Sequence, residues 1–312
     1  MNEPIILALP RSINLELLQP LVDAGLTIVP NDTGQKLDYA QISELTKNRE
    51  DVVGVIAGLE VWNQEVINLF PNLRAVSRLG VGLDSVDVHY AAQKNIAIST
   101  TNSAVVTSVA EHTVGLILSL IRSIPQSHNM VCSEIWNPIM GDTLEGKQVG
   151  VVGLGRIGSS VASKLSALGC RVATYDPMIS GQVNSGAKMG FVRVLEFDEL
   201  LIQSDIVTLH VPLQEETLNM IGLQEMKLIG SDGFLINTSR GGIVVETDLL
   251  EALSAGIIKG AALDVFSVEP YYGPLLKSKN LIMTPHVGTQ TIAARRLMHD
   301  EAVANLLKDL GD

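Results

Sequence analysis

The sequence predicts an α/β protein built from two doubly wound parallel sheets. Its 312 residues are too many for one ordinary hydrophobic core, because domains usually contain about 100–200 residues. Short apolar runs alternate with amphipathic stretches along the whole chain, which is the pattern of βα units around a parallel sheet. The apolar residues are mainly Val, Ile, Leu and Ala, and only 4% of the chain is aromatic. This composition suits strands that are buried on both faces.

The first βα series occupies the first third of the chain. We predict its strands at Ile5–Leu9, Leu26–Val29, Val52–Ile56, Leu73–Ser77 and Ile96–Ile98. Helices are predicted between them at Asn14–Asp23, Tyr39–Lys47, Gln64–Leu69 and Ser85–Gln93. Asp84 is the expected N-cap of the fourth helix, because its short acidic side chain can accept from the free amides of the first turn.

A long helix and an irregular arm are predicted next. The helix covers about Ala104–Arg122, and we expect Pro125 to end it because proline has no amide hydrogen. The stretch Ser127–Gly146 shows no clear periodicity and carries Trp136 and Pro138. We interpret it as an arm or a connection.

A second βα series begins at Lys147. Its predicted strands are Val149–Val152, Arg171–Tyr175, Phe191–Val194, Ile206–His210, Phe234–Asn237, Ala261–Asp264 and Leu281–Met283. A last helix is expected over about Thr291–Leu310. The pattern therefore indicates two parallel-sheet domains joined by two long helices.

Charge and cysteine content limit the partners and the compartment. The formal net charge is −12, and an acidic surface repels nucleic acid and anionic membrane, so we expect neither as a partner. Cys132 and Cys170 allow one disulfide, but reduced thiols in a cytoplasmic protein are the simpler interpretation. We expect no secretory signal. The apolar helical stretch Thr113–Ile121 is about half of the ~20 residues that a membrane span needs.

The strongest motif is the glycine-rich run Gly153-Leu154-Gly155-Arg156-Ile157-Gly158. It follows an apolar strand directly and opens the helix Ser159–Leu168, which is the context of a dinucleotide-binding loop. Gly153 allows the tight turn, Gly155 lets the backbone approach a pyrophosphate, and Gly158 lets the helix pack on the strand. The helix N-terminus attracts phosphate, and Arg156 can add a charged contact.

An acidic residue ends the next predicted strand. Asp176 lies 18 residues beyond Gly158, near the spacing of an acid that binds the adenosine ribose hydroxyls. A carboxylate there repels a 2′-phosphate, so the sequence predicts NAD rather than NADP as the cofactor. The alternative is a turn aspartate before Pro177.

Three further strands run into polar residues. Arg240, Glu269 and His286 each follow a predicted strand, and ligands of open α/β sheets bind at the carboxyl ends of strands. Arginine can clamp a carboxylate, histidine can transfer a proton, and glutamate can orient the imidazole. Each residue alone has an ordinary structural interpretation. We assign no metal site. The other histidines are assigned to such structural roles: His89, His112, His128, His210 and His299.

Taken together, the motifs resemble the D-isomer-specific 2-hydroxyacid dehydrogenases, in particular the phosphoglycerate dehydrogenase-like branch. The resemblance covers nearly the whole chain. It rests on GLGRIG, Asp176, TLHVPL (Thr208–Leu213), NTSRGG (Asn237–Gly242), DVFSVEP (Asp264–Pro270), TPHVG (Thr284–Gly288), RLGVGLDSVD (Arg78–Asp87) and Asn102–Thr113.

The resemblance implies an oxidoreductase that moves a hydride between NAD and a small 2-keto or D-2-hydroxy acid. Arg240 would bind the substrate carboxylate, His286 would be the acid/base, and Glu269 would be its partner. The expected substrate contacts are Arg78, Val81, Gly82, Arg240 and His286. The expected cofactor contacts are Val109, Gly153, Gly155, Arg156, Ile157, Gly158, Asp176, His210, Val211, Pro212, Thr238, Ser239, Asp264 and Gly288.

The same resemblance implies the domain order. A Rossmann NAD-binding domain, residues 102–287, would be inserted in a flavodoxin-like substrate domain made of residues 1–101 and 288–312. A cleft between the two domains would close on the substrate. The family also implies a C2 homodimer through the NAD-binding domain, formed by the arm.

The sequence departs from the phosphoglycerate branch at several points. The chain ends after its last helix, so we expect a short form without the regulatory domain. Ala57 and Pro138 stand where that branch has arginines, although Arg78 remains. A phosphate group needs several strong donors, so we expect an unphosphorylated acid such as glyoxylate, hydroxypyruvate or a keto acid of a specialised pathway. The alternative is an NAD-sensing binding protein of the corepressor kind, against which the absence of long tails and of a basic patch argues.

Overall fold

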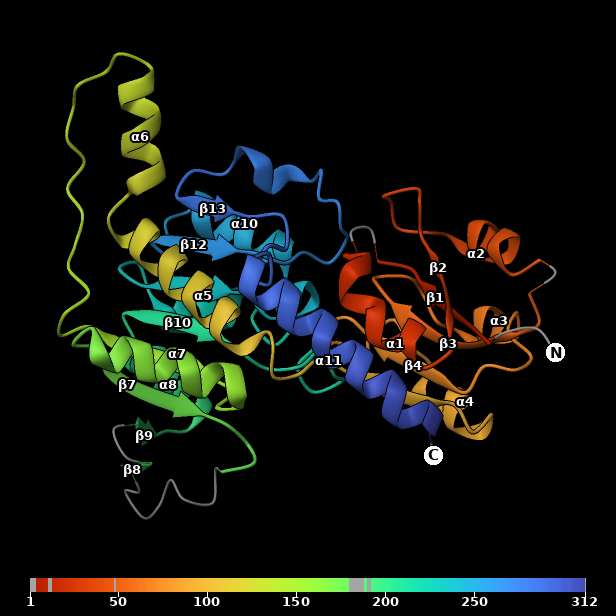
Figure 1. Ribbon diagram of the computed structural model, residues 1–312. Helices are drawn as coiled ribbons and strands as arrows, with labels where there is room; N and C mark the ends of the chain where they lie inside the picture. The colour runs from red at the N-terminus through yellow and green to blue at the C-terminus, as the bar shows by residue number, and fades with distance from the viewer. Residues whose placement is uncertain (1–3, 11–12, 48, 180–187, 190–191, 312) are drawn as a thin grey trace. The chain divides into compact units, whose positions relative to one another are not determined.

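The protein consists of two compact units. The computed structural model describes residues 4–10, 13–47, 49–179, 188–189 and 192–311 (Figure 1). Unit 1 contains Met1–Val105 and Gln290–Asp312, and unit 2 contains Val106–Thr289. Both boundaries lie a few residues beyond the expected ones. The amides of Ser103 and Ala104 donate to the carboxylate of Glu301 in unit 1, at 3.2 and 3.3 Å, which keeps this segment with unit 1.

Unit 1 is a five-stranded parallel sheet in the order β2-β1-β3-β4-β5, which is a flavodoxin-like order. Each strand lies within two residues of its predicted position. The strands are β1 (Ile5–Ala8), β2 (Thr27–Pro30), β3 (Val52–Ala57), β4 (Ala75–Arg78) and β5 (Ala97–Thr100).

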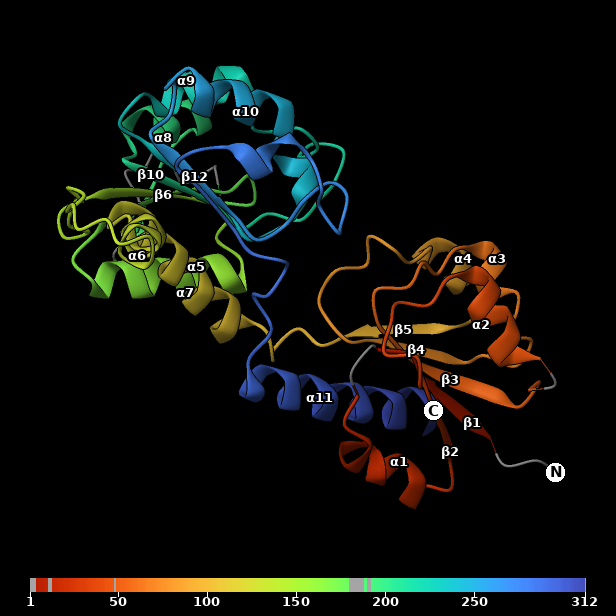
Figure 2. The same ribbon diagram turned by 90° about the horizontal axis from the view of Figure 1, so that it is seen from above.

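Helices cover both faces of this sheet (Figure 2). One face carries α2 (Tyr39–Thr46), α3 (Gln64–Ile67) and α4 (Val88–Gln93). The other carries α1 (Gln19–Asp23), preceded by a short 3₁₀ turn, and α11 (Ile292–Gly311). A Cβ on Gly54 of β3 would lie 3.3 Å from Leu310 Cδ1 and 3.5 Å from Leu306 Cδ2, so α11 packs closely on the sheet.

The expected cap of the fourth helix was wrong. α4 begins at Val88, and Asp87 caps it by accepting a hydrogen bond from the amide of Tyr90 at 2.9 Å. Asp84 precedes a segment that pairs in extended form with Trp62, whose amide donates to the carbonyl of Ser85 at 2.6 Å. Residues in such a bridge cannot enter a helix, so the helix begins later than its sequence suggested.

Unit 2 is an eight-stranded sheet in the order β13-β12-β11-β10-β6-β7-β9-β8. Counted from β6, the six strands β9-β7-β6-β10-β11-β12 follow the Rossmann order, and β13 and β8 add one further strand at each edge. Phe191 of the predicted third strand lies outside the described residues. The strands are β6 (Gln148–Val152), β7 (Arg171–Tyr175), β8 (Lys188–Met189), β9 (Val192–Val194), β10 (Ile206–Leu209), β11 (Phe234–Asn237), β12 (Gly260–Leu263) and β13 (Leu281–Met283).

The pairing is parallel except between β8 and β9, which are antiparallel. β8 has only two residues, too few for an apolar pattern, and was not predicted. Figure 2 shows α5 (Val106–Ile121) and α7 (Arg156–Ala167) on one face of the sheet. The other face carries α8 (Phe197–Gln203), α9 (Leu223–Ile229) and α10 (Glu246–Ser254). The predicted class of two parallel-sheet α/β domains is thus confirmed.

A helix occupies the first part of the expected arm. α5 ends at Ile121 and α6 (Ile124–Cys132) follows it, so Pro125 lies in the first turn of a second helix and is not the residue that ends the first one. Proline is tolerated there because an amide in the first turn has no partner within the helix. Ser123 separates the two helices with a left-handed φ of 51°. Figure 1 shows α6 and the chain after it projecting from the rest of unit 2.

Two general properties complete the fold. Cys132 is exposed and Cys170 is buried, and both are free thiols. Among the described residues, no helix combines the length and the apolar character that crossing a membrane requires.

Candidate active site

The predicted site residues of unit 2 gather because their strands end level with one another. Val152, Leu209, Asn237, Leu263 and Met283 are consecutive register partners across the sheet. Tyr175 of β7 pairs with Val152 on the other side. The residues that follow these strand ends therefore lie along one edge: Gly153, Asp176, His210, Thr238, Asp264 and Thr284.

The glycine-rich loop has the geometry that its sequence predicted. Gly153 has a φ of +89°, and a Cβ there would lie 2.6 Å from the carbonyl oxygen of His210. A Cβ on Gly158 would lie 2.0 Å from the carbonyl oxygen of Gly153, so only glycine fits. Gly155, the N-cap of α7, has no atom within 4 Å of its Cβ position. Gly153 and Gly158 are thus in close contact with neighbouring backbone, whereas the Cβ position of Gly155 faces open space. A phosphate-binding loop needs this combination.

Asp176 connects the end of β7 to this loop. Its Oδ2 accepts a hydrogen bond from the amide of Leu154 at 2.8 Å, and its Oδ1 accepts one from Met178 at 2.9 Å. The second bond is the turn interaction of the alternative interpretation, which the structure therefore contains. Carboxylate oxygens have further lone pairs for ribose hydroxyls. The residues present therefore fit a dinucleotide, with Arg156 exposed at the start of α7.

His210 and Val211 pack against the glycine-rich loop. A Cβ on Gly153 would also lie 2.8 Å from Val211 Cγ1. His210 Nε2 lies 2.9 Å from Thr208 Oγ1, and burial lowers the pKa of His210 to about 3. This imidazole is therefore neutral at physiological pH and packs beside the glycines, in keeping with a structural histidine.

The segment that carries Arg240 is a stiff turn after β11. Asn237 Oδ1 accepts hydrogen bonds from the amide and the hydroxyl of Ser239, at 3.0 and 2.8 Å. Asn237 Nδ2 donates to the carbonyl oxygen of Arg240 at 2.7 Å. A Cβ on Gly241 would lie 1.9 Å from the carbonyl carbon of Phe266. Glycine thus lets the Arg240 turn lie against the segment that leads to Glu269.

Glu269 and His286 form a hydrogen-bonded pair. Nδ1 of His286 lies 2.9 Å from Oε2 of Glu269, and Oε1 of Glu269 accepts from the amide of Phe266 at 3.1 Å. Burial by itself raises the pKa of Glu269, but the hydrogen bond and the charge of His286 outweigh it, so this pKa lies below its ordinary value. The carboxylate is therefore ionised and holds one ring nitrogen, which leaves Nε2 of His286 as the end that can exchange a proton with a ligand.

Asp264 anchors the loop that carries His286. Its Oδ1 accepts from Thr284 Oγ1 at 2.6 Å and from the amide of Val287 at 2.9 Å, and its Oδ2 accepts from the amide of Gly288 at 2.9 Å. His112 of α5 completes the set, with Nε2 3.3 Å from Oδ1. Burial raises the pKa of Asp264, but these hydrogen bonds outweigh it and the pKa lies below its ordinary value. His112, expected from the sequence to have only a structural role, therefore lies within the predicted site.

The other predicted cofactor contacts lie beside this anchor. A Cβ on Gly288 would lie 3.2 Å from Asp264 Oδ2 and 3.4 Å from Val109 Cγ2. Val109 and Thr238 are both largely buried. In the described part of the chain, no group of three or more His, Cys, Asp and Glu side chains is placed to hold a metal ion.

The substrate residues predicted in unit 1 share one turn after β4. Arg78 is 8% exposed, and its Nη1 donates to the carbonyl oxygen of Leu79 at 2.6 Å. Gly80 has a φ of +146°, and its amide donates to Thr101 Oγ1 at 2.8 Å. Arg78 is therefore buried against the turn, whereas Val81 and Gly82 are partly exposed.

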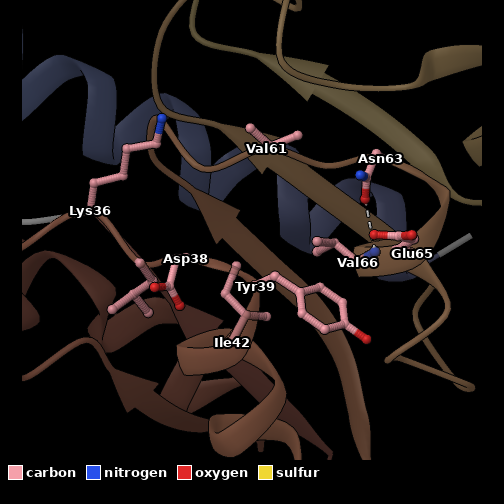
Figure 3. Close-up of a pocket in the computed structure, with 9 residues that line it drawn as sticks. Lys36, Asp38, Tyr39, Ile42, Val61, Asn63, Glu65 and Val66 are labelled. Atoms are coloured by element: carbon pink, nitrogen blue, oxygen red, sulfur yellow. Dashed lines mark hydrogen bonds between the residues drawn. The ribbon is translucent and has the colours of Figure 1, made fainter. Parts of the chain in front are cut away.

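A separate hollow of about 350 Å³ lies in unit 1 between the first turns of α2 and α3 (Figure 3). None of the predicted site residues contributes to it, and most of its lining side chains are exposed. The lining residues are Lys36, Leu37, Asp38, Tyr39, Ile42, Val61, Asn63, Glu65 and Val66.

Several known proteins are similar to this chain in sequence or in fold. Over 85% of this chain and 80% of the relative, the sequence is 36% identical to a glyoxylate reductase from Thermofilum pendens. It is 38% identical over 79% of the chain to a D-3-phosphoglycerate dehydrogenase from Archaeoglobus fulgidus, and it spans 47% of that relative's length. An NADPH-dependent glyoxylate/hydroxypyruvate reductase from Sinorhizobium meliloti, in complex with NADP and malonate, has a similar fold. The TM-score is 0.84, with 30% identity over 98% of this chain and 93% of that chain.

The family resemblance is confirmed by a direct match. The sequence pattern of the D-isomer specific 2-hydroxyacid dehydrogenase, NAD binding domain, covers residues 114–288, which is more than half of the chain. This range holds the glycine-rich loop, Arg240, Glu269 and His286. The chain belongs to the D-isomer specific 2-hydroxyacid dehydrogenase family.

Proposed function

We propose that the protein is an NAD-dependent oxidoreductase acting on a small 2-keto or D-2-hydroxy acid. The observation that carries this proposal is the 2.9 Å contact between His286 Nδ1 and Glu269 Oε2. The pair follows the same sheet edge as the glycine-rich loop, where a nicotinamide and its substrate would meet. A hydrogen-bonded acid/base pair is needed for catalysis, whereas cofactor sensing alone does not require it. This favours the enzyme over the binding-protein alternative.

Residues of this chain would bind the negatively charged carboxylate of the substrate and would transfer the proton. When NAD is bound, its nicotinamide supplies or takes up the hydride. Arg240 binds the substrate carboxylate through its planar guanidinium. Glu269 holds the ring of His286 through Nδ1, so that Nε2 gives a proton to the substrate oxygen in reduction and removes it in oxidation. Asp264 keeps the His286 loop in place through its hydrogen bonds.

The preference for NAD would rest on Asp176. Its carboxylate lies at the end of β7 beside the glycine-rich loop, where it would accept from ribose hydroxyls and repel a 2′-phosphate. The Sinorhizobium meliloti relative is described as NADPH-dependent. The choice of cofactor therefore has to come from this chain's own residue at that position.

The substrate would be unphosphorylated. Ala57 is fully buried at the end of β3, and Pro138 lies in the exposed chain after α6, so neither position supplies a cation. Arg78 is only 8% exposed, and its Nη1 donates to the carbonyl oxygen of Leu79. Two of the relatives are named for glyoxylate or hydroxypyruvate, which fits small acids without a phosphate group.

The assembly would be a homodimer formed through α6 and the chain that follows it. α6 has no buried residue. Trp136 and Met140 are 88% and 95% exposed, and Ile124, Val131 and Ile135 are each about half exposed. Apolar side chains gathered in this way mark an interaction surface, and a second copy that offers the same segment would cover it.

A substrate panel tests the proposed activity. NADH oxidation is followed with glyoxylate, hydroxypyruvate, pyruvate and phosphohydroxypyruvate, for the wild type and for His286→Gln. We expect turnover of at least one unphosphorylated acid, and loss of it in the variant. Wild-type protein that binds NADH tightly but reduces none of these acids overturns the assignment.

A further inference from the structure

Three side chains of α5 are hydrogen-bonded to two segments of the candidate active site, the loop after β13 and the turn after β11. Ser108 Oγ donates to the carbonyl oxygen of Gly288 at 2.6 Å. His112 Nε2 lies 3.2 Å from Thr284 Oγ1, and Thr113 Oγ1 lies 2.9 Å from Thr238 Oγ1. Residues four apart share a helix face, so Ser108 and His112 reach the same loop, the one that carries His286.

His112 has a defined hydrogen-bonding role in this arrangement. The hydroxyl of Thr284 donates to Asp264 Oδ1 at 2.6 Å, so its oxygen can only accept from His112. The carboxylate of Asp264 also only accepts. Nε2 of His112 faces these two acceptors at 3.2 and 3.3 Å and must carry a hydrogen. His112 is thus the donor that joins the Asp264–Thr284 pair to a long helix.

The loop held by this pair has an unfavourable backbone. His286 has a φ of +54°, in the left-handed region that non-glycine residues rarely adopt. Its amide donates to the carbonyl oxygen of Asp264 at 2.9 Å, and the next two amides donate to the Asp264 carboxylate. Such a conformation persists where the surroundings fix it. Asp264 supplies these contacts, and the orientation of its side chain depends in turn on Thr284 and His112.

We propose that His112 is a positioning residue for proton transfer, acting through Asp264 and Thr284 to fix the loop of His286. This rests on the proposed function, in which His286 exchanges the proton. His112 does not touch the reacting groups. Its loss would leave the residues of the glycine-rich loop intact and would misplace the acid/base. The main effect is expected in kcat, and the KM for NADH should change less, because, of the predicted cofactor contacts, only Asp264 and Gly288 belong to the anchor.

Two substitutions separate the donor from the rest of the side chain. His112→Gln places an amide nitrogen near the position of Nε2 and keeps the donor, whereas His112→Asn is too short to reach Asp264. Glu111→Gln is the matched control, because Glu111 is the exposed neighbour whose carboxylate lies 3.5 Å from Lys164 on α7. If His112→Asn does not fold, Thr284→Val removes the same bridge from the other side.

Hydrogen–deuterium exchange measures the loop without any substrate. The amides of Val287 and Gly288 are protected by Asp264, so a peptide covering residues 285–289 reports the anchor. We expect about tenfold faster exchange of this peptide in His112→Asn than in wild type, since local opening sets the rate. His112→Gln and Glu111→Gln should exchange at nearly the wild-type rate, and so should peptides from β6 in all variants.

Steady-state kinetics completes the test. We expect kcat to fall about ten- to hundredfold in His112→Asn, because small misplacements of catalytic groups have effects of about this size. The KM for NADH should change less, and kcat should be restored in His112→Gln. Wild-type exchange and wild-type kcat in His112→Asn overturn the proposal, and so does equal loss in both variants. Wild-type protein that reduces no keto acid overturns the proposed function instead, while the exchange data still decide whether His112 fixes the loop.

Discussion

The carboxylate of Asp176 accepts a hydrogen bond from the amide of Leu154 at 2.8 Å, which ties the end of β7 to the glycine-rich loop. The residue that would select the cofactor thus also helps to shape the loop that would bind its phosphates. A substitution at this position has two effects, on charge and on loop geometry, and a useful variant separates them.

Asp176→Asn removes the charge and keeps the side-chain shape and the bond from Leu154, because the amide oxygen can still accept; only the bond from Met178 is lost. We expect the ratio of kcat/KM for NADH to that for NADPH to fall by about tenfold or more, because the repulsion of the 2′-phosphate is lost. Asp176→Ser should relax the ratio further. The measurement uses both cofactors with the best keto acid, and a wild-type preference for NADPH would contradict the assignment of Asp176.

Arg240 is expected to be essential for substrate binding. Arg240→Ala should lower kcat/KM for the keto acid by about ten- to hundredfold or more, the size of a lost hydrogen bond to a charged group. Arg240→Lys keeps the charge but loses the planar fork, so much of the loss should remain. NADH affinity, measured by fluorescence, serves as the control. Near-normal kcat/KM in Arg240→Ala would place the carboxylate site elsewhere.

His286→Gln should remove most of the chemical rate. General acid–base catalysis typically contributes about 10²–10⁴-fold, and the variant should lose a factor in that range. NADH binding should survive, because the glycine-rich loop and Asp176 are unchanged. A single-turnover measurement with saturating NADH checks this, and a variant that retains more than about half of the wild-type rate is incompatible with His286 as the proton donor.

The depressed pKa of Glu269 makes the stability of the pair depend on pH. A carboxyl group with a lowered folded-state pKa stabilises the fold fully above its unfolded pKa, about 4.3, and the contribution is lost as the pH falls through the folded pKa. The free energy of unfolding of the wild type should therefore exceed that of Glu269→Gln at neutral pH, and the gap should close in acid.

The size of this gap is limited by exposure. The Glu269 side chain is 33% exposed and that of His286 is 38% exposed, so the gap should be about 1 kcal/mol or less. Urea titrations of both proteins between neutral and acidic pH measure it. A gap that widens as the pH falls would mean that the folded state raises the pKa of Glu269 instead of lowering it.

The proposed dimer is tested at Trp136 and Met140. Their replacement by Glu places charges in a surface that a second copy would cover, so the variant should sediment as a monomer while the wild type sediments as a dimer. Secondary structure by circular dichroism should be unchanged, since both side chains are almost fully exposed. A wild-type monomer at micromolar concentration excludes this assembly.

Much of this fold could be predicted from the sequence, because each strand of a doubly wound sheet is a short apolar run that local composition reveals. Elements that depend on distant partners could not. The start of α4 is delayed by the pairing of residues near Val86 with Trp62, which no local pattern encodes. Pro125 is compatible with either the end or the beginning of a helix, and only the backbone at Ser123 decides between them.

The candidate site could also be predicted only in part from the sequence. The sequence points to Glu269 and His286 because each follows a strand end, and parallel strands bring their ends together. His112 lies within a mostly apolar helix, and its partners Asp264 and Thr284 come much later in the chain. His112 does lie in Asn102–Thr113, one of the segments that carry the family resemblance, but its contacts with Asp264 and Thr284 are visible only in three dimensions.

The position of α11 has a consequence for the order in which the protein is completed during synthesis. α11 covers the sheet face around Gly54 with Leu306 and Leu310, yet it is translated after the whole of unit 2. Unit 2 is one continuous stretch and can close its core while α11 is still inside the ribosome. The unit whose strands are translated first is therefore completed after the other unit, and its bare apolar face is exposed to aggregation or to chaperones until α11 emerges.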